Sequence, residues 1–290
     1  MTKSRGYILT LLAATIFAAQ DGVSKYLGTH YPPIFITMIR YWVFTAFVIF
    51  LAMRSGGILK VAATTRPFLQ LFRGALLATE IVIFIYGLTL VGLAMAQSII
   101  QIAPLLITML SVPFLGEKIG WRRWSAIVAG FLGVLLIINP TGASFDLNLL
   151  LPLTAAVMFS IYSVATRAVS KTDSSVTSLF YTAVGGVLVL TVAGLFQMVP
   201  IAPKDWIWVA ALCACGISSH FCLIKAYEVL EASEVQPLTY LQLVFGAFIA
   251  TFIFHETLTW NIILGAIIVV GAGLFSIFRQ RVVAQKQSSS

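Results

Sequence analysis

The feature that most constrains this chain is a succession of apolar stretches with few charged residues. An α-helix needs about 20 such residues to cross the hydrocarbon core of a bilayer. Ten stretches are of this length, with boundaries set by turn residues between them. They lie at residues 6–27, 33–53, 67–91, 94–115, 121–139, 148–170, 175–198, 204–227, 232–254 and 258–279. The sequence therefore predicts an all-α integral membrane protein with ten transmembrane helices.

The composition agrees with a surface that faces lipid. Hydrophobic residues make up 60% of the chain and charged residues only 10%, whereas a soluble domain carries about 25% charged residues. The net charge of +8 comes from cations placed between apolar stretches and not from a patch, so we expect no nucleic acid as a partner. The three cysteines share one apolar stretch without metal-ligand spacing, and we expect neither a metal nor a cofactor.

An internal repeat divides the predicted helices into two halves. Residues 113–121 read PFLGEKIGW and residues 252–260 read FIFHETLTW, so that Glu117 corresponds to Glu256 at an offset of 139. Five helices per repeat is an odd number, so the second copy enters the membrane from the opposite side. We predict two inverted five-helix repeats, residues 1–141 and 142–290, around a central cavity.

The positions of Lys and Arg predict the orientation. With the N-terminus in the cytoplasm, most of the 18 Lys and Arg residues fall on the cytoplasmic side, as they do in membrane proteins generally. Arg122 and Arg123 follow the first copy of the repeated phrase, whereas Asn261 and Ile262 follow the second, which this orientation places outside. We expect both termini in the cytoplasm.

The chain resembles a known family. An apolar helix ends in Gly-Glu-Lys at residues 116–118, ahead of an amphiphilic Trp, and Pro104 lies thirteen residues before the Glu. With ten helices in two halves, this is similar to the EamA-type exporters of the drug/metabolite transporter superfamily, over essentially the whole chain. The second half departs from the pattern at Leu243, which stands where the first half has Pro104, and at His255, which replaces the usual Gly. Pro104 and Pro237 are expected bending points, because proline loosens backbone pairing.

The resemblance implies a secondary transporter that works by alternating access. Among relatives, the bacterial aromatic amino acid exporters of the inner membrane look most similar. This implies an inner-membrane protein that exports small amphiphilic metabolites, and aromatic or other neutral amino acids are the favoured substrates. An uncoupled facilitator and an exporter of drugs or other metabolites stay open. An intramembrane enzyme is a remote alternative, because the sequence shows no nucleophile–base or metal-ligand arrangement, and we expect no enzymatic activity.

The expected partners are the lipid bilayer and a small-molecule substrate. The resemblance further implies that helices 121–139 and 258–279 lie at the periphery. Small residues along both helices, among them Gly133 and Gly265, permit close helix contact. This contact lies either within one protomer or in a homodimer formed through these two helices.

Ionisable residues inside the predicted helices mark candidate functional positions, because a charge is costly in hydrocarbon. Glu80 lies near the middle of the third stretch and His220 in the eighth. We predict that both border the cavity, where they can hold or pass a proton; a local structural role is the alternative. Arg40 either extends to the outer face or lines the cavity, where it suits a carboxylate. Asp21 and Lys25, one helical turn apart, are predicted to pair.

Amides and phenols form the second candidate set. Gln97 and Gln101 share one helix face, and Gln236 and Tyr240 repeat this spacing at an offset of 139. We predict that the two pairs line two walls of one cavity, with hydrogen bonding between helices as the competing interpretation. Aromatic rings with a polar tip complete the set. These are Tyr41, Tyr86, Tyr162 and Tyr181.

Overall fold

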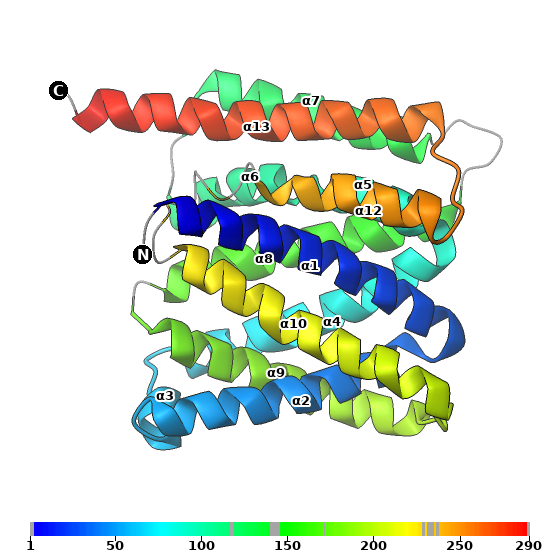
Figure 1. Cartoon of the computed structure of the whole chain (residues 1–290). Helices are drawn as coiled ribbons and strands as arrows, with labels where there is room; N and C mark the ends of the chain where they lie inside the picture. The colour runs from blue at the N-terminus through cyan, green and yellow to red at the C-terminus, as the bar shows by residue number, and fades with distance from the viewer. Residues whose placement is uncertain are drawn as a thin grey trace.

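Every regular element that the structure describes is a helix (Figure 1). The computed structural model describes residues 3–116, 119–139, 146–170, 172–227, 230, 235 and 238–288. Within these residues, nine helices are long and apolar enough to cross a membrane, and Leu241–Phe252 is a shorter apolar helix. The elements are α1 (Lys3–His30), α2 (Pro33–Arg54), α3 (Ile58–Ala62), α4 (Pro67–Val91), α5 (Leu93–Ile100), α6 (Ala103–Leu115), α7 (Trp121–Ile138), η1 (Leu147–Leu149), α8 (Leu150–Val169), α9 (Ser175–Gly194), η2 (Leu195–Gln197), η3 (Pro203–Asp205), α10 (Trp206–Tyr227), α12 (Leu241–Phe252) and α13 (Trp260–Ser288). The predicted all-α membrane fold is confirmed, although only part of the ninth predicted stretch is described.

Local chemistry sets most helix boundaries. Pro33 and Pro67 begin α2 and α4, where proline fits because the first turn of a helix needs no N–H donor. Gly116 ends α6 and Asn139 ends α7 in the left-handed conformation, which these residue types tolerate. Ser174 caps α9 by accepting a hydrogen bond from the backbone N–H of Thr177.

The fourth predicted stretch is divided into α5 and α6. Pro104 has no amide hydrogen, so the carbonyl of Ile100 loses its helical partner. The helical turn is tighter at this point, because the N–H of Ile102 donates to the carbonyl of Ile99, three residues back and not four, at 3.2 Å. The bend expected at Pro104 is confirmed, whereas Pro237 lies outside the described residues.

Contacts between helices occur in matching pairs. α1 packs against α10 and α12, and α8 packs against α4 and α6. α2 packs against α9, and α7 against α13. In the two predicted repeats, α1 corresponds to α8, α2 to α9, α4 to α10, α6 to α12 and α7 to α13. Replacing every helix by its counterpart gives the same set of contacts, which is expected of two equivalent halves. The first turn of α1 and the last described turns of α13 lie at the same end of the bundle (Figure 1).

α7 and α13 form the outermost layer on one side of the bundle (Figure 1). Their backbones meet at two glycines: a Cβ on Gly265 would lie 2.6 Å from the carbonyl oxygen of Gly133. Only residues without side chains allow this approach. The predicted small-residue contact is thus formed within one protomer, and no second copy of the chain is needed to explain these two glycines.

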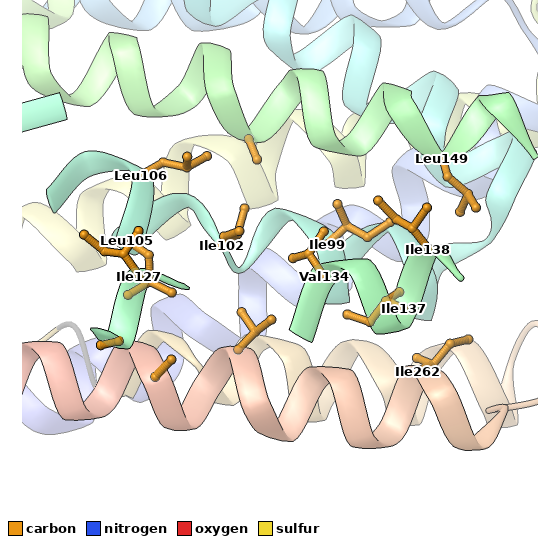
Figure 2. Packing of buried hydrophobic residues seen from close by; sticks show 14 residues of the cluster. Ile99, Ile102, Leu105, Leu106, Ile127, Val134, Ile137, Ile138, Leu149 and Ile262 are labelled. Atoms are coloured by element: carbon orange, nitrogen blue, oxygen red, sulfur yellow. The ribbon is translucent and has the colours of Figure 1, made fainter. Parts of the chain in front are cut away.

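A buried aliphatic cluster attaches this layer to the rest of the bundle. Figure 2 shows residues of the α5–α6 segment beside α7, with Ile262 of α13 completing the contact. The labelled members are Ile99, Ile102, Leu105, Leu106, Ile127, Val134, Ile137, Ile138, Leu149 and Ile262. This cluster is entirely apolar, so the candidate functional residues must be sought outside it.

Candidate functional site

A small cavity lies among α2, α4, α8, α9 and α10. Its volume is about 50 Å³, whereas a pocket for a drug-sized ligand measures roughly 300–1,000 Å³. The structure therefore holds this site closed, and the helices must separate before a metabolite can enter. The lining residues are Arg40, Tyr41, Phe44, Leu77, Ile81, Tyr162, Leu179, Thr182, Cys213, Gly216 and Ile217.

Arg40 brings a positive charge to this cavity. Only 9% of the residue is exposed, so of the two predicted alternatives the structure shows the cavity position. A Cβ on Gly216 of α10 would lie 3.1 Å from Arg40 Nε, so the glycine makes room for the guanidinium. A guanidinium offers parallel N–H donors that match the two oxygens of a carboxylate.

Two buried carboxyl groups accompany Arg40. Asp21 on α1 and Glu80 on α4 are 8% and 4% exposed, and both interact electrostatically with Arg40. Neither acid is among the residues that line the cavity, although Glu80 was predicted to border it. Glu80 also interacts with Asp21. Arg40 is thus a cation that the two acids share. Two acids facing one cation leave one negative charge to be balanced by a proton or by a cationic ligand.

Amide groups from two helices hold Asp21. Gln97 Nε2 of α5 and Gln242 Nε2 of α12 donate to Asp21 Oδ2 at 2.8 and 2.9 Å. The predicted pair of Asp21 with Lys25 is wrong, because Lys25 pairs with Glu256. Gln97 does not line the cavity. Its amide instead donates to the buried Asp21 carboxylate, which needs hydrogen-bond donors. For Gln97, the competing interpretation of helix-to-helix hydrogen bonding describes the structure.

A buried arginine that the sequence reasoning missed supports one wall of the cavity. Arg73 of α4 is 1% exposed. Its Nη1 donates to the hydroxyls of Tyr162, at 3.2 Å, and Thr166, at 3.0 Å, and its Nη2 donates to the carbonyl of Ser178. Arg73 thus fastens α4 to α8 and α9 and fixes the Tyr162 phenol that lines the cavity.

Three predicted phenols lie away from the cavity, which corrects the predicted set. Tyr181 donates to the carbonyl of Ala62 at 2.8 Å and joins α9 to α3. Tyr86 packs against a buried apolar cluster. The hydroxyl of Tyr240 lies against Gly273 of α13 and has no hydrogen-bond partner among the described residues. In each case the tyrosine side chain takes part in contacts between helices and not in the cavity lining.

Three further predicted residues contribute nothing described to the cavity. Gln101 lies half-buried at the α5–α6 break and is absent from the lining. Gln236 and the side chain of His220 lie outside the described residues, so the predicted pairing of Glu80 with His220 is not tested. Among the described side chains, no group of three or more His, Cys, Asp or Glu is placed to hold a metal ion.

Comparison with known proteins identifies the family. The sequence model of the EamA-like transporter family matches residues 4–139 and, a second time, residues 147–278. The chain belongs to the EamA-like transporter family. It is therefore a multi-pass membrane transporter, and the resemblance drawn from the sequence is confirmed at the level of the family.

Relatives of this EamA-like transporter carry different names. It is 31% identical to an S-adenosylmethionine uptake transporter of Rickettsia felis, over 97% of this chain and 95% of that protein. It is 27% identical to a riboflavin transporter of Vibrio cholerae, over 92% and 90%. It is 26% identical to a pseudopaline exporter of Pseudomonas aeruginosa, over 83% and 85%. A crystal structure at 20% identity matches 98% of this chain and 99% of its own with a TM-score of 0.63, which shows the shared fold.

Proposed function

We propose that this EamA-like transporter carries a cationic, ring-bearing metabolite of the S-adenosylmethionine class across the membrane. The observation that carries the proposal is the buried cluster of Asp21 and Glu80 with the cation Arg40. S-adenosylmethionine has a sulfonium and an ammonium group, one carboxylate and a planar base. Its net charge of one positive unit balances the one surplus carboxylate of the cluster.

The cavity residues, together with the two acids behind them, offer a partner for each part of such a ligand. Arg40 binds the ligand carboxylate through paired N–H donors. Glu80 and Asp21 lie outside the cavity lining but interact with Arg40, and they supply negative charge for the ammonium and sulfonium groups. The rings of Tyr41, Phe44 and Tyr162 line the same cavity and supply surfaces for the base and for the sulfonium cation.

This proposal departs from the amino acid substrate that the sequence favoured. A neutral amino acid carries equal positive and negative charges, so the surplus carboxylate would then need a proton to balance it, whereas a cationic ligand balances it directly. The names of the relatives point to S-adenosylmethionine, riboflavin and pseudopaline, which also favours a larger substrate. We propose uptake, following the rickettsial relative, in place of export.

Transport by alternating access requires the two halves to move against each other. We propose that residues 1–141 and 142–290 are the inverted halves, which the matching contacts of α1 with α10 and of α8 with α4 support. The end of the bundle that holds both termini is proposed to face the cytoplasm, on the distribution of Lys and Arg. The closed cavity then corresponds to a state through which the substrate passes.

Uptake into proteoliposomes tests the proposal. Purified protein should accumulate radiolabelled S-adenosylmethionine, and excess unlabelled compound should compete, whereas phenylalanine should not. Glu80→Gln should lower the uptake rate by about tenfold or more, because a buried charge partner is lost. Asp146→Asn is the matched control, since Asp146 is an exposed acid that only caps its own turn. Uptake of phenylalanine without uptake of S-adenosylmethionine would overturn the proposed substrate.

A further inference from the structure

The loop between α12 and α13 carries a carboxylate that reaches two distant helices. Glu256 Oε1 accepts the N–H of Leu93 at 2.8 Å, and Oε2 accepts the N–H of Ala94 at 3.0 Å, both in the first turn of α5. Lys25 of α1 forms an ion pair with the same carboxylate. The Lys25 ammonium also lies 4.5 Å from the centre of the Phe254 ring. One side chain thereby joins α1, α5 and the α12–α13 loop.

The backbone around Glu256 is shaped for this contact. His255 has a φ of 55°, a left-handed conformation that is uncommon outside glycine, and the N–H of Glu256 bonds the carbonyl of Ala250 at 2.9 Å. Across the contact, Gly92 has a φ of 95°, and a Cβ there would lie 3.0 Å from Glu256 Oε2. Helix N-termini also carry a partial positive charge that favours a carboxylate.

The contact lies between an open hollow and the buried acids. A hollow of about 420 Å³ borders it, and its lining includes Gly92, Ala94 and Glu256. Asp21 lies one turn deeper along α1 than Lys25, away from the end of that helix. The contact of Lys25 with Glu256 thus lies beside the hollow and one helical turn from Asp21.

Hydration distinguishes this contact from the Arg73 network. The side chains of Lys25 and Glu256 are 11% and 18% exposed, so this ion pair is largely but not fully buried. Breaking a fully buried ion pair is costly because each charge is left without a partner or water, and partial exposure lowers that cost. Arg73 is 1% exposed and bonded to four other residues, which suits a permanent connection.

We propose that Lys25, Glu256 and the first amides of α5 form a latch that closes one mouth of the transport pathway and opens in each cycle. Lys25 and the α5 amides belong to the proposed first half and Glu256 to the second, so separating the halves breaks the latch. The inference rests on the proposed transport function. It adds a gate at a site outside the cavity.

Cys213 provides a native reporter, because it lines the cavity. In a chain with Cys215→Ser and Cys222→Ser, a membrane-impermeant methanethiosulfonate reagent is applied to one side of oriented vesicles. Glu256→Ala and Lys25→Met should raise the rate of Cys213 modification from one side only, by about tenfold, as expected for lost hydrogen bonds to a charged group. Asp146→Ala, the control, should leave the rate unchanged.

A cross-link gives a second readout that does not depend on Glu256→Ala reaching the membrane. In a chain whose native cysteines are replaced, Lys25→Cys and Glu256→Cys are joined by a cleavable bifunctional thiol reagent. Joined protein should lose transport, and reduction should restore it. Transport at an unchanged rate by the joined protein would overturn the latch, as would equal Cys213 labelling in the latch variants and the parent.

The two proposals fail separately. Labelling of Cys213 needs no substrate, so faster labelling in Glu256→Ala without any uptake of S-adenosylmethionine would reject the proposed substrate and keep the latch. Uptake of S-adenosylmethionine with unchanged labelling would keep the substrate and reject the latch.

Discussion

Replacing Arg73 by Met should destabilise the protein more than any exposed charge does. The change removes both donors of Gln70 Oε1, at 3.2 and 2.9 Å, and one partner each of the Tyr162 and Thr166 hydroxyls. The carbonyl of Ser178 keeps the Thr182 hydroxyl at 2.8 Å. Gln70 Oε1 and the Tyr162 hydroxyl thus lose every described partner, whereas the Thr166 hydroxyl keeps the carbonyl of Tyr162 at 2.7 Å. At about 1–3 kcal/mol per unsatisfied group, we expect a loss of about 2–4 kcal/mol.

Thermal unfolding in detergent, followed by tryptophan fluorescence, measures this loss. For a chain of this size, about 1 kcal/mol corresponds to roughly 2–4 °C, so Arg73→Met should lower Tm by about 5–10 °C. Arg73→Lys should fall between, since it keeps the charge and loses the planar fork. Arg54→Met removes an exposed cation from the end of α2 and is the control. If Arg73→Met melts within about 1 °C of the parent, the network does not fasten α4 to α8 and α9.

Two further changes test the packing and the loop chemistry. Gly74→Ala should lower Tm, because the new Cβ would lie 2.4 Å from the carbonyl oxygen of Tyr181. Gly120→Ala is the control and should leave Tm unchanged, because its Cβ meets nothing within 4 Å. Equal Tm values for the two variants would contradict the close approach of α4 to α9. Partial loss of water alone would raise the pKa of Asp173, but hydrogen bonds from Thr64 and Gln70 outweigh this and lower it. The resulting stabilisation is present above the ordinary Asp pKa of about 3.9 and disappears as pH falls through the lowered value, so the Tm difference between parent and Asp173→Asn should shrink below about pH 4. A difference that grows on acidification would contradict this.

The sequence predicted the helices well, because composition and turn residues act locally. The apolar length of each stretch, the prolines at helix starts and the bend at Pro104 are all properties of a few adjacent residues. Glu80 and Arg40 were recognised as candidate functional residues for the same reason, since a charge inside an apolar stretch is visible in the sequence, although the sequence left Arg40 open between the outer face and the cavity. Asp21 is also a charge inside an apolar stretch, but Lys25 lies one helical turn away, and the sequence analysis therefore paired the two residues.

The partners of these charges could not be predicted locally. Lys25 binds Glu256, which is remote in sequence, and Asp21 takes amides from α5 and α12. The repeat offset related Gln97 to Gln236 but did not say which way either side chain points. The apolar lining was missed for another reason. In a chain that is 60% hydrophobic, Phe44 and Ile81 look like any residue that faces lipid.

The central claim is that a surplus buried carboxylate selects a cationic ligand. Calorimetric titration of the purified protein with S-adenosylmethionine and with S-adenosylhomocysteine, which lacks the methyl group and the sulfonium charge, tests it most directly. We predict tighter binding of the charged compound, by about tenfold or more at a low effective dielectric constant, and loss of that preference in Glu80→Gln. Equal affinities for the two compounds, or a preference that survives this substitution, would contradict the account.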